Sequence, residues 1–283
     1  MLKLKTSSKL PLWLGFAFCF FLVTNTAFAS FHKNTWPKWS VHNPLSQDVI
    51  SHEEWQTFLT RCVFTNKEEI NLIDYPHLNK DDLALLNQYV KRMSQVNIHN
   101  YNRNEQLAFW LNLYNALTIQ IVANYYPVEC IDDINISPGL FSVGPWGAQL
   151  VTVAGTPLSL DDIQNRIIRP IWNDPRTHYA LNDASIGAAN LHKEAFQGAR
   201  LEHQLNHVAQ KYINSLRGVQ VIDGKLIVSK IYDWYIEDFG GNEPALIHHL
   251  TVYAKEPLRN QLQLVSSVNS YMYNWHINST VAT

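Results

Sequence analysis

Apolar and polar residues alternate at helical spacing in two segments of the N-terminal half, Ser46 to Val63 and Lys80 to Val96. Apolar residues that recur every three or four positions lie on one face of a helix, so both segments predict amphipathic helices. Asn79 stands directly before the second segment, where an N-cap residue is expected. The stretch from Asn66 to His77 contains Pro76 and mixed charges, and we interpret it as a surface connection between the two helices.

A third segment, Glu105 to Tyr125, is apolar nearly all round, which is typical of a helix buried at the centre of a protein. Its polar exceptions, Glu105, Asn112 and Asn115, form one stripe along the helix. A buried carboxylate and two buried amides need hydrogen-bond partners, because burying them unpaired costs free energy. The stripe therefore predicts either a structural hydrogen-bond network, which is the commoner outcome, or the floor of a functional site.

The chain after this helix breaks into shorter elements. Residues Ser137 to Gly147 are rich in Gly, Pro and aromatic residues, and they predict a loop that would suit the lip of a pocket. Two hairpins are expected, one from Leu150 to Leu160 and one from Val219 to Val228. The run from Thr177 to Asn182 predicts a buried strand.

The segment from Leu201 to Leu216 predicts an amphipathic helix with His203 and His207 on the side opposite its apolar face. A zinc-protease helix reads His-Glu-x-x-His, but Gln204 occupies the general-base position here and no third ligand is evident. A solvated helix face is therefore the default interpretation. The sequence also contains no nucleotide-binding loop, dinucleotide fingerprint or cysteine-rich metal motif. We accordingly expect no metal and no cofactor.

The C-terminal region predicts a helical stretch from Asn242 to Gln263 that is interrupted at Pro257, followed by a closing strand from Ser266 to Trp275. Long helices mixed with two hairpins and no alternating βαβ pattern favour an α+β fold. We expect a predominantly helical single domain with a small antiparallel or mixed sheet. Its predicted organisation is a signal peptide (1–29), an N-terminal helical extension (30–100), a core (101–240) and a C-terminal helix and strand packed on that core (241–283).

The N-terminus has the pattern of a cleavable secretory signal. Lys3, Lys5 and Lys9 precede an apolar stretch from Leu10 to Val23, and Ala27-Phe28-Ala29 follows as a small-x-small cleavage site. We expect cleavage after Ala29. The apolar stretch is shorter than the roughly 20 residues of a membrane-spanning helix, so no stable anchor is expected after cleavage. The predicted location is the periplasm or the outside of the cell.

The composition describes a packed globular protein: of 283 residues, 46% are hydrophobic, 16% charged and 12% aromatic, which excludes disorder and coiled coils. Loss of the signal peptide would change the formal net charge from −2 to about −5. Neither nucleic acid nor an anionic membrane surface is therefore an expected partner. A small-molecule or peptide ligand remains open, as does the oligomeric state.

Two cysteines remain after the predicted cleavage, Cys62 and Cys130. Export to an oxidising compartment would permit a disulfide between them. The alternative is two unrelated thiols that pack as small hydrophobic side chains. The sequence leaves both possibilities open.

Five ordered motifs between Arg103 and Phe239 resemble the bacterial members of the domain-of-unknown-function family 547. These motifs are Glu105 to Leu117, Gly144 to Trp146, Leu160 to Pro170, Asp174 to Asn182 and Ile231 to Phe239. The resemblance brings no established activity with it.

The chain departs from the pattern of that family at the residues that carry chemistry. Family members typically read Asn-Cys-Ala-Ser, two further residues, then Cys-Pro, whereas Asp183, Ala188 and Ala189 replace the two cysteines and the proline here. The family's Glu-His appears as Gln164-Asn165. A Cys and a His brought together by the fold would suggest thiol chemistry for the family, because a base activates the thiol. Neither Asp183 nor Asn165 can replace that pair, so cysteine-dependent catalysis is not expected.

The remaining polar groups support two hypotheses. The favoured one is a non-catalytic exported binding or assembly module that keeps the fold and pocket of the family. The other is a hydrolase or transferase that uses Asp183, His178 and Glu105, with His178 as the base. The further candidates for ligand binding are Asn112, Asn115, Trp146, Asn165, Arg169 and Ser185.

Geometry separates these two hypotheses. Convergence of the three catalytic candidates on one open pocket would favour the enzyme. The alternative is that Asp183 caps a turn and His178 is hydrogen-bonded in the core.

Overall fold

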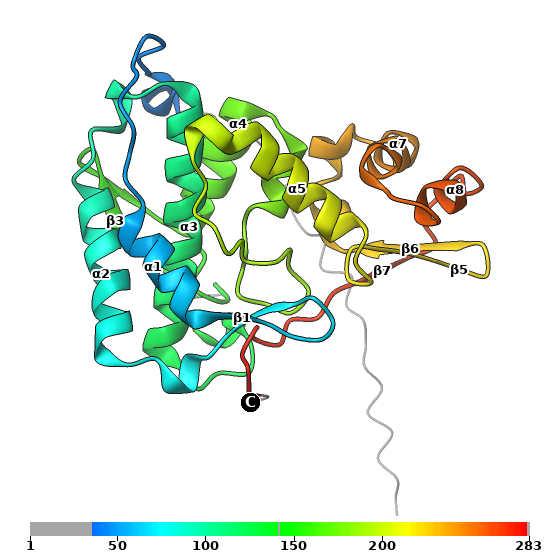
Figure 1. The fold of residues 1–283 in the computed structure, drawn as a ribbon, viewed down its shortest axis with the longest axis horizontal. Helices are drawn as coiled ribbons and strands as arrows, with labels where there is room; N and C mark the ends of the chain where they lie inside the picture. Colours follow the sequence, from blue (N-terminus) through cyan, green and yellow to red (C-terminus); the bar gives the residue numbers. More distant parts are fainter. Residues whose placement is uncertain (1–35, 141, 282–283) are drawn as a thin grey trace, which may run out of the picture.

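The computed structural model describes residues 36–140 and 142–281 of the chain (Figure 1). The predicted signal peptide and its cleavage site after Ala29 lie outside the described residues. Within the described ranges, helices carry most of the regular structure and the strands form small sheets, which confirms the α+β fold. No helix in these ranges is long and apolar enough to cross a membrane.

The α-helices of the described ranges are α1 (Glu53–Cys62), α2 (Lys80–Ser94), α3 (Arg103–Tyr125), α4 (Arg169–Trp172), α5 (Leu201–Ile213), α6 (Ile231–Trp234), α7 (Glu243–Tyr253) and α8 (Leu258–Leu262). The strands are β1 (Val63–Thr65), β2 (Asn71–Ile73), β3 (Val151–Val153), β4 (Thr156–Leu158), β5 (Val219–Ile222), β6 (Lys225–Ser229) and β7 (Ser270–Met272). A π-helical segment, Asp162–Ile168, runs directly into α4.

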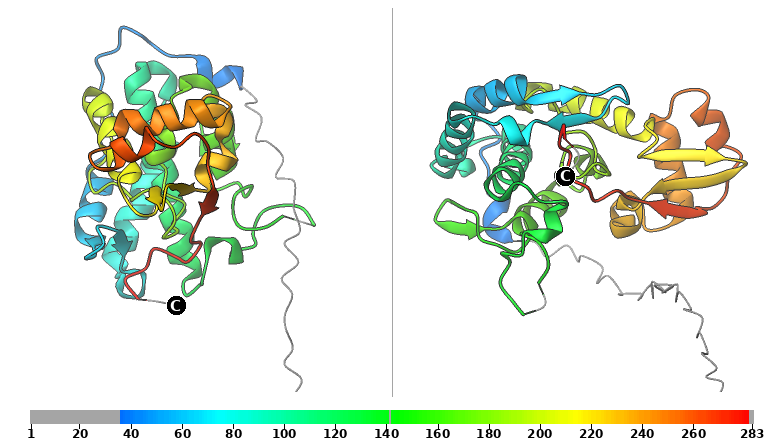
Figure 2. Two further views of the ribbon diagram at one scale, coloured as in Figure 1. Left: turned by 90° about the vertical axis from the view of Figure 1, so that its right-hand side faces the viewer. Right: turned by 90° about the horizontal axis from the view of Figure 1, so that it is seen from below.

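The helices α1, α2 and α3 pack in a larger part of the molecule, and α7, α8 and the three-stranded sheet form a smaller part beside it (Figures 1 and 2). In that sheet β5 pairs with β6 antiparallel, and β7 adds to β6 in parallel. The chain after β7 then runs back along the larger part, where Ser185 pairs with Ile277 and Ile73 with Ser279. This return places the C-terminal segment next to residues that lie far away in the sequence.

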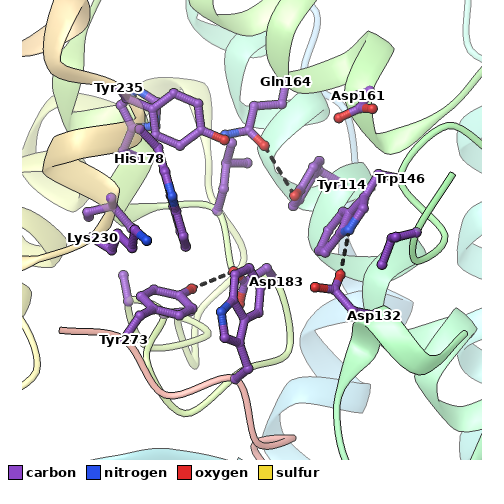
Figure 3. A pocket seen from close by; sticks show the side chains of 17 residues that line it. Tyr114, Asp132, Trp146, Asp161, Gln164, His178, Asp183, Lys230, Tyr235 and Tyr273 are labelled. Carbon is purple, nitrogen blue, oxygen red and sulfur yellow. Dashed lines mark hydrogen bonds between the residues drawn. The ribbon is translucent and has the colours of Figure 1, made fainter. Parts of the chain in front are cut away.

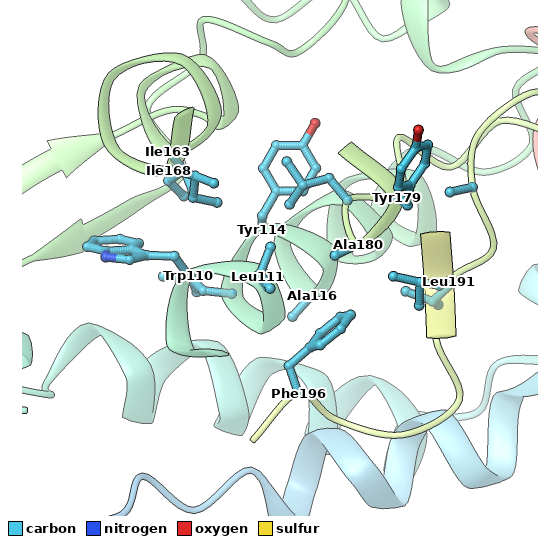
Figure 4. Close-up of a cluster of buried hydrophobic side chains, with 14 of the residues drawn as sticks. Trp110, Leu111, Tyr114, Ala116, Ile163, Ile168, Tyr179, Ala180, Leu191 and Phe196 are labelled. Carbon is cyan, nitrogen blue, oxygen red and sulfur yellow. The ribbon is translucent and has the colours of Figure 1, made fainter. Parts of the chain in front are cut away.

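The helix α3 is the centre of the core, as its all-round apolar pattern predicts. Every residue from Glu105 to Ile119 is buried. Figure 4 shows Ile163 and Ile168 near Trp110 of α3, while Phe196 lies on another side of the helix. Burial on all sides explains why α3 needs no polar face.

Side-chain caps fix where two of the main helices begin. The Asn79 side chain accepts hydrogen bonds from the backbone N–H groups of Asp81 and Asp82, and the Asp82 carboxylate accepts from the N–H of Asn79. The predicted cap of α2 at Asn79 is therefore confirmed. Asn102 accepts hydrogen bonds from the N–H groups of Asn104 and Glu105 and starts α3 in the same way.

Two sequence-based expectations in the N-terminal region are wrong in part. The helix expected over Ser46 to Val63 begins only at Glu53. The stretch from Asn66 to His77 is more than a connection, because β1 and β2 form an antiparallel hairpin there. The Asn66 side chain accepts hydrogen bonds from the N–H groups of Glu68 and Ile70, which closes the turn. Such local side-chain bonding lets polar residues form a tight turn that reads as a loop in the sequence.

The buried strand expected over Thr177 to Asn182 is also wrong. The structure has a 3₁₀ helix, Pro175–Tyr179, whose first residue follows the capping side chain of Asp174. Asp followed by Pro favours the start of a helical turn, because Pro fixes φ and lacks the N–H that such a turn leaves unpaired. The segment is buried as expected. Its apolar sequence reflects this burial and not an extended backbone, which is why it resembled a strand.

The remaining elements follow the sequence closely. Both expected hairpins form, as β3–β4 and β5–β6. The helical stretch of the C-terminal region is split into α7 and α8 around Pro257. The predicted closing strand is present as β7. Cys62 and Cys130 are both free thiols in the structure, which favours two unrelated thiols over the disulfide.

Candidate functional site

A cavity of about 450 Å³ opens beside α3 (Figure 3). Its walls come from α3, the loops before β3 and before α5, the π-helical segment, α6 and the chain after β7. The lining residues are Tyr114, Asp132, Val143, Trp146, Asp161, Gln164, His178, Leu181, Asp183, Ala188, Ala189, Lys230, Ile231, Trp234, Tyr235, Tyr273 and Trp275. Val143 and Trp146 belong to the Gly- and Pro-rich loop, which does contribute to the wall of a pocket as expected.

Asp183 is held in the cavity wall by three donated hydrogen bonds. The backbone N–H and the hydroxyl of Ser185 donate to its Oδ1 at 3.0 and 2.5 Å, and the Tyr273 hydroxyl donates to its Oδ2 at 2.5 Å. Burial raises the pKa of Asp183, and the hydrogen bonds from Ser185 and Tyr273 oppose that rise. Asp183 therefore caps the turn that follows it while its side chain lines the cavity.

His178 reaches the cavity from the 3₁₀ helix and is fixed on both sides. Its Nε2 lies 2.8 Å from Oδ2 of Asp238, and the same oxygen accepts a hydrogen bond from Nε of Arg169 at 2.5 Å. The imidazole stacks on Tyr235 with 4.2 Å between ring centroids. An imidazole oriented by a carboxylate is an arrangement that can serve a general base, although Arg169 shares the carboxylate here.

The opposite wall of the cavity carries Asp132 and Asp161 together with Tyr114 and Trp146 (Figure 3). The Trp146 indole N–H donates to Oδ1 of Asp132 at 2.8 Å. Oδ1 of Asp161 accepts a long hydrogen bond, 3.3 Å, from Nδ2 of Asn165. Burial raises the pKa of Asp161, and the neighbouring Asp162 carboxylate raises it further.

Three aromatic residues form a corner of the cavity. Trp234, Tyr273 and Trp275 contact one another with ring centroids 4.7 to 5.3 Å apart. Trp234 comes from α6, whereas Tyr273 and Trp275 lie in the chain that returns after β7. Burial raises the pKa of the Tyr273 hydroxyl well above its ordinary value, and the Asp183 carboxylate adds to that rise. Tyr273 therefore stays a hydrogen-bond donor at neutral pH.

The polar residues of the α3 stripe have two roles. Asn112 and Asn115 bind buried backbone groups, whereas Glu105 lies in the first turn of the helix. Asn112 donates to the carbonyl of Phe196 and accepts from its N–H, at 2.8 and 2.9 Å. Asn115 binds the backbone of the segment before Asp183 in the same way. It donates to the carbonyl of Ala180 and accepts from the N–H of Asn182, at 2.9 and 2.8 Å. Both amides thus satisfy buried backbone groups, which is the network alternative of the sequence analysis.

Glu105 does not reach the cavity. Its Oε2 accepts a hydrogen bond from the N–H of Ile50 at 3.2 Å. Its side chain also lies against Gly198, where a β-carbon would come within 2.4 Å of Oε1. The structure therefore brings His178 and Asp183 to one cavity and leaves Glu105 at the start of α3.

The other sequence-based candidates lie in or directly behind the cavity wall. Trp146 lines it. Ser185 lies behind Asp183 and is 1% exposed. Asn165 bridges Asp161 and Arg169, since its Oδ1 accepts a hydrogen bond from Nη1 of Arg169 at 3.0 Å. These residues position lining side chains and do not line the cavity themselves, apart from Trp146.

Sequence reasoning missed Asp132, Asp161, Lys230, Tyr273 and Trp275 as lining residues. Tyr273 and Trp275 were assigned to a closing strand. Aromatic residues so close together in the sequence could have indicated a functional surface as well as a packed one. The two carboxylates had no such signal, because surface loops are rich in Asp.

The positions where the family pattern has cysteine, proline and glutamate do converge. Asp183, Ala188, Ala189 and Gln164 all line this cavity. Asn165, at the position of the family histidine, is hydrogen-bonded to the lining residue Asp161. The positions at which the sequence predicts departures from that pattern therefore lie at one site.

His203 and His207 are exposed on α5. In residues 36–140 and 142–281, the structure has no group of three or more His, Cys, Asp or Glu side chains placed to hold a metal ion.

Comparison with known proteins finds one family. Residues 98–213 match the model of a family described as "Protein of unknown function, DUF547". The matched region includes α3, the Asp183 turn and α5, but ends before α6 and the returning C-terminal segment. No curated protein and no solved structure matches the chain.

Proposed function

We propose that the chain, whose residues 98–213 match the DUF547 family model, is an exported protein that binds a small molecule without transforming it. The basic start, the apolar stretch and Ala27-Phe28-Ala29 support export to the periplasm or the outside of the cell. The cavity that contains the departures from the family pattern supports binding.

One observation supports the non-catalytic part of the proposal. Asp183, which stands where the resembled family has a cysteine, serves as a hydrogen-bond acceptor. Asp183 receives three hydrogen bonds from neutral donors, and none of these donors is a base. Ser185 is buried, and its hydroxyl donates a hydrogen bond to Asp183. A nucleophile needs access to the substrate, and the buried Ser185 hydroxyl is not among the groups that line the cavity.

A second candidate function rests on His178. This imidazole lines the same cavity as Asp183 and is oriented by Asp238, as a general base would be. A hydrolase or transferase that uses His178 and Asp183 is therefore the alternative, without Glu105.

Purified protein incubated with ester, amide, glycoside and phosphoester substrates should show no turnover above buffer. The same preparation should bind at least one small molecule at a single site, detected as a saturable change in tryptophan fluorescence, because Trp146, Trp234 and Trp275 line the cavity. The control is His178→Asn, which removes the only group that the second candidate uses as a base. Turnover that disappears in His178→Asn would replace the binding function by the enzyme.

Export is tested separately. Protein recovered after expression in a bacterium with a secretory pathway should begin at Ser30, as measured by mass spectrometry of its N-terminal peptide. Ala29→Arg should block this cleavage, because the signal peptidase site requires small residues, and Thr24→Ser is a matched change outside that site. An intact N-terminus on protein with the native sequence would contradict the export proposal.

A further inference from the structure

We propose that the ligand of this cavity is an organic cation, an ammonium group joined to an apolar body, with the ammonium held on the side of Asp132 and Asp161. This inference rests on the binding function proposed above and gives it a ligand class. Two independent features carry it: the charges that line the cavity and the aromatic surfaces between them.

The carboxylates of the cavity have no cationic partner in the part of the chain that the structure describes. Asp132 is bonded to the indole of Trp146, and Asp161 to the amide of Asn165. Asp183 is bonded to Ser185 and Tyr273 and to no other side chain of residues 36–140 and 142–281. Carboxylates in a partly desolvated cleft focus a negative potential, and that potential attracts a cation and repels an anion.

The free oxygens of two of these carboxylates are available to a ligand. Asp132 and Asp161 each use Oδ1 for the hydrogen bond described above, and no hydrogen bond to Oδ2 is found within residues 36–140 and 142–281. Neither Oδ2 is among the buried side-chain atoms of the described residues that lack a hydrogen-bond partner. An ammonium group has several N–H donors, and either Oδ2 could accept a hydrogen bond from it. The pKa of Asp161 is raised because no positive charge offsets the effect of burial there.

The aromatic residues offer faces that suit both halves of such a ligand. Tyr114 and Trp146 lie on the same side of the cavity as Asp132 and Asp161 (Figure 3). The negative face of an aromatic ring attracts a cation within about 6 Å, and the attraction is strongest for Trp. The corner of Trp234, Tyr273 and Trp275 offers an apolar surface to the remainder of the ligand.

Lys230 determines which way the ligand lies. In Figure 3 it stands beside His178, across the cavity from Asp132 and Asp161. Like charges repel, so the ammonium of the ligand is expected at the Asp132–Asp161 side. A neutral sugar would also stack on the aromatic rings and hydrogen-bond the carboxylates, but it would leave their charge without compensation. The charge balance therefore favours the cation.

Three probes of one shape separate these ligand classes: phenethylamine, phenethyl alcohol and phenylacetate. Titration calorimetry with the intact protein should show phenethylamine binding at least tenfold more tightly than phenethyl alcohol, and no measurable binding of phenylacetate. Added salt should weaken the binding of the amine, because ions screen the attraction between charges. Equal affinity for the amine and the alcohol, or no binding of the amine, would overturn the inference.

Two variants locate the ammonium. Asp161→Asn and Asp132→Asn keep the shape and the Oδ1 acceptor, and each should weaken phenethylamine about tenfold, or about 1.4 kcal/mol, without changing the affinity for phenethyl alcohol. Asp223→Asn is the matched control, because Asp223 is exposed in the β5–β6 turn.

Unchanged amine binding in both cavity variants would contradict the proposed position of the ammonium. Binding of the alcohol without binding of the amine would refute the cation, while the binding function would stand. Substrate turnover in the panel described above would instead remove the binding function.

Discussion

Replacing Asn115 by leucine should lower the free energy of unfolding by about 4 kcal/mol, because two buried backbone groups lose their partner. The side chain of Asn115 now satisfies the carbonyl of Ala180 and the N–H of Asn182. Leucine has a similar volume, so the loss comes from unpaired polar groups and not from a cavity. Chemical denaturation measures the change.

The same variant should also loosen the cavity. Residues Ala180 to Asn182 directly precede Asp183, so their release frees one wall of the site. Hydrogen exchange of the 180–189 segment should therefore rise in Asn115→Leu. The matched control is Asn112→Leu, which unpairs the backbone of Phe196 by the same chemistry. It should lose similar stability but keep slow exchange in residues 180–189, and equal exchange in both variants would contradict the assignment.

Acid should destabilise the protein through His52. Burial, with the positive charge of Arg92, lowers the pKa of His52 from 6.5 to about 4. Its Nδ1 lies 2.7 Å from the Tyr89 hydroxyl, and its buried Nε2 has no hydrogen-bond partner in the described part of the chain. The unfolded chain takes up a proton near pH 6.5, but the folded chain resists it until about pH 4. Stability from the neutral imidazole is therefore full above pH 6.5 and falls as the pH drops towards 4.

The loss between pH 7 and pH 4.5 should be about 2 kcal/mol from His52. His249 adds a loss of the same sign, since burial lowers its pKa to about 4 as well. His52→Gln keeps a hydrogen-bonding side chain for Tyr89 but cannot titrate, so the difference in unfolding free energy between the two pH values should shrink by that amount. His203→Gln, at an exposed position of α5, is the control. An unchanged pH difference in His52→Gln would refute the linkage.

Local sequence patterns were sufficient for much of the fold. The all-round apolar pattern of α3, the Asn79 cap and the β5–β6 turn each depend on residues within a few positions of one another, and each is present as expected. The strand expected over Thr177 to Asn182 was wrong for a related reason. Burial gave that segment the apolar composition of a strand, while the turn chemistry of Asp174 and Pro175 decided its backbone.

The candidate site was predicted only in part. The sequence singled out Asp183 and His178, and both line one cavity. It also grouped Glu105 with them, but Glu105 lies at the start of α3 and binds the backbone of Ile50. Helical periodicity gave the face of α3 on which Glu105 lies and carried no information about which neighbour covers that face at each turn.

From the sequence alone came the α+β class, the central helix and the family resemblance. These are properties of short segments, in which residue type and spacing restrict the backbone directly. Only the tertiary structure assembled the cavity. The hydrogen bond from Tyr273 to Asp183 joins residues 90 positions apart, and it exists because β7 adds to β6 and directs the C-terminal segment back towards α3. Contacts over that separation depend on the packing of the whole chain, which no local pattern contains.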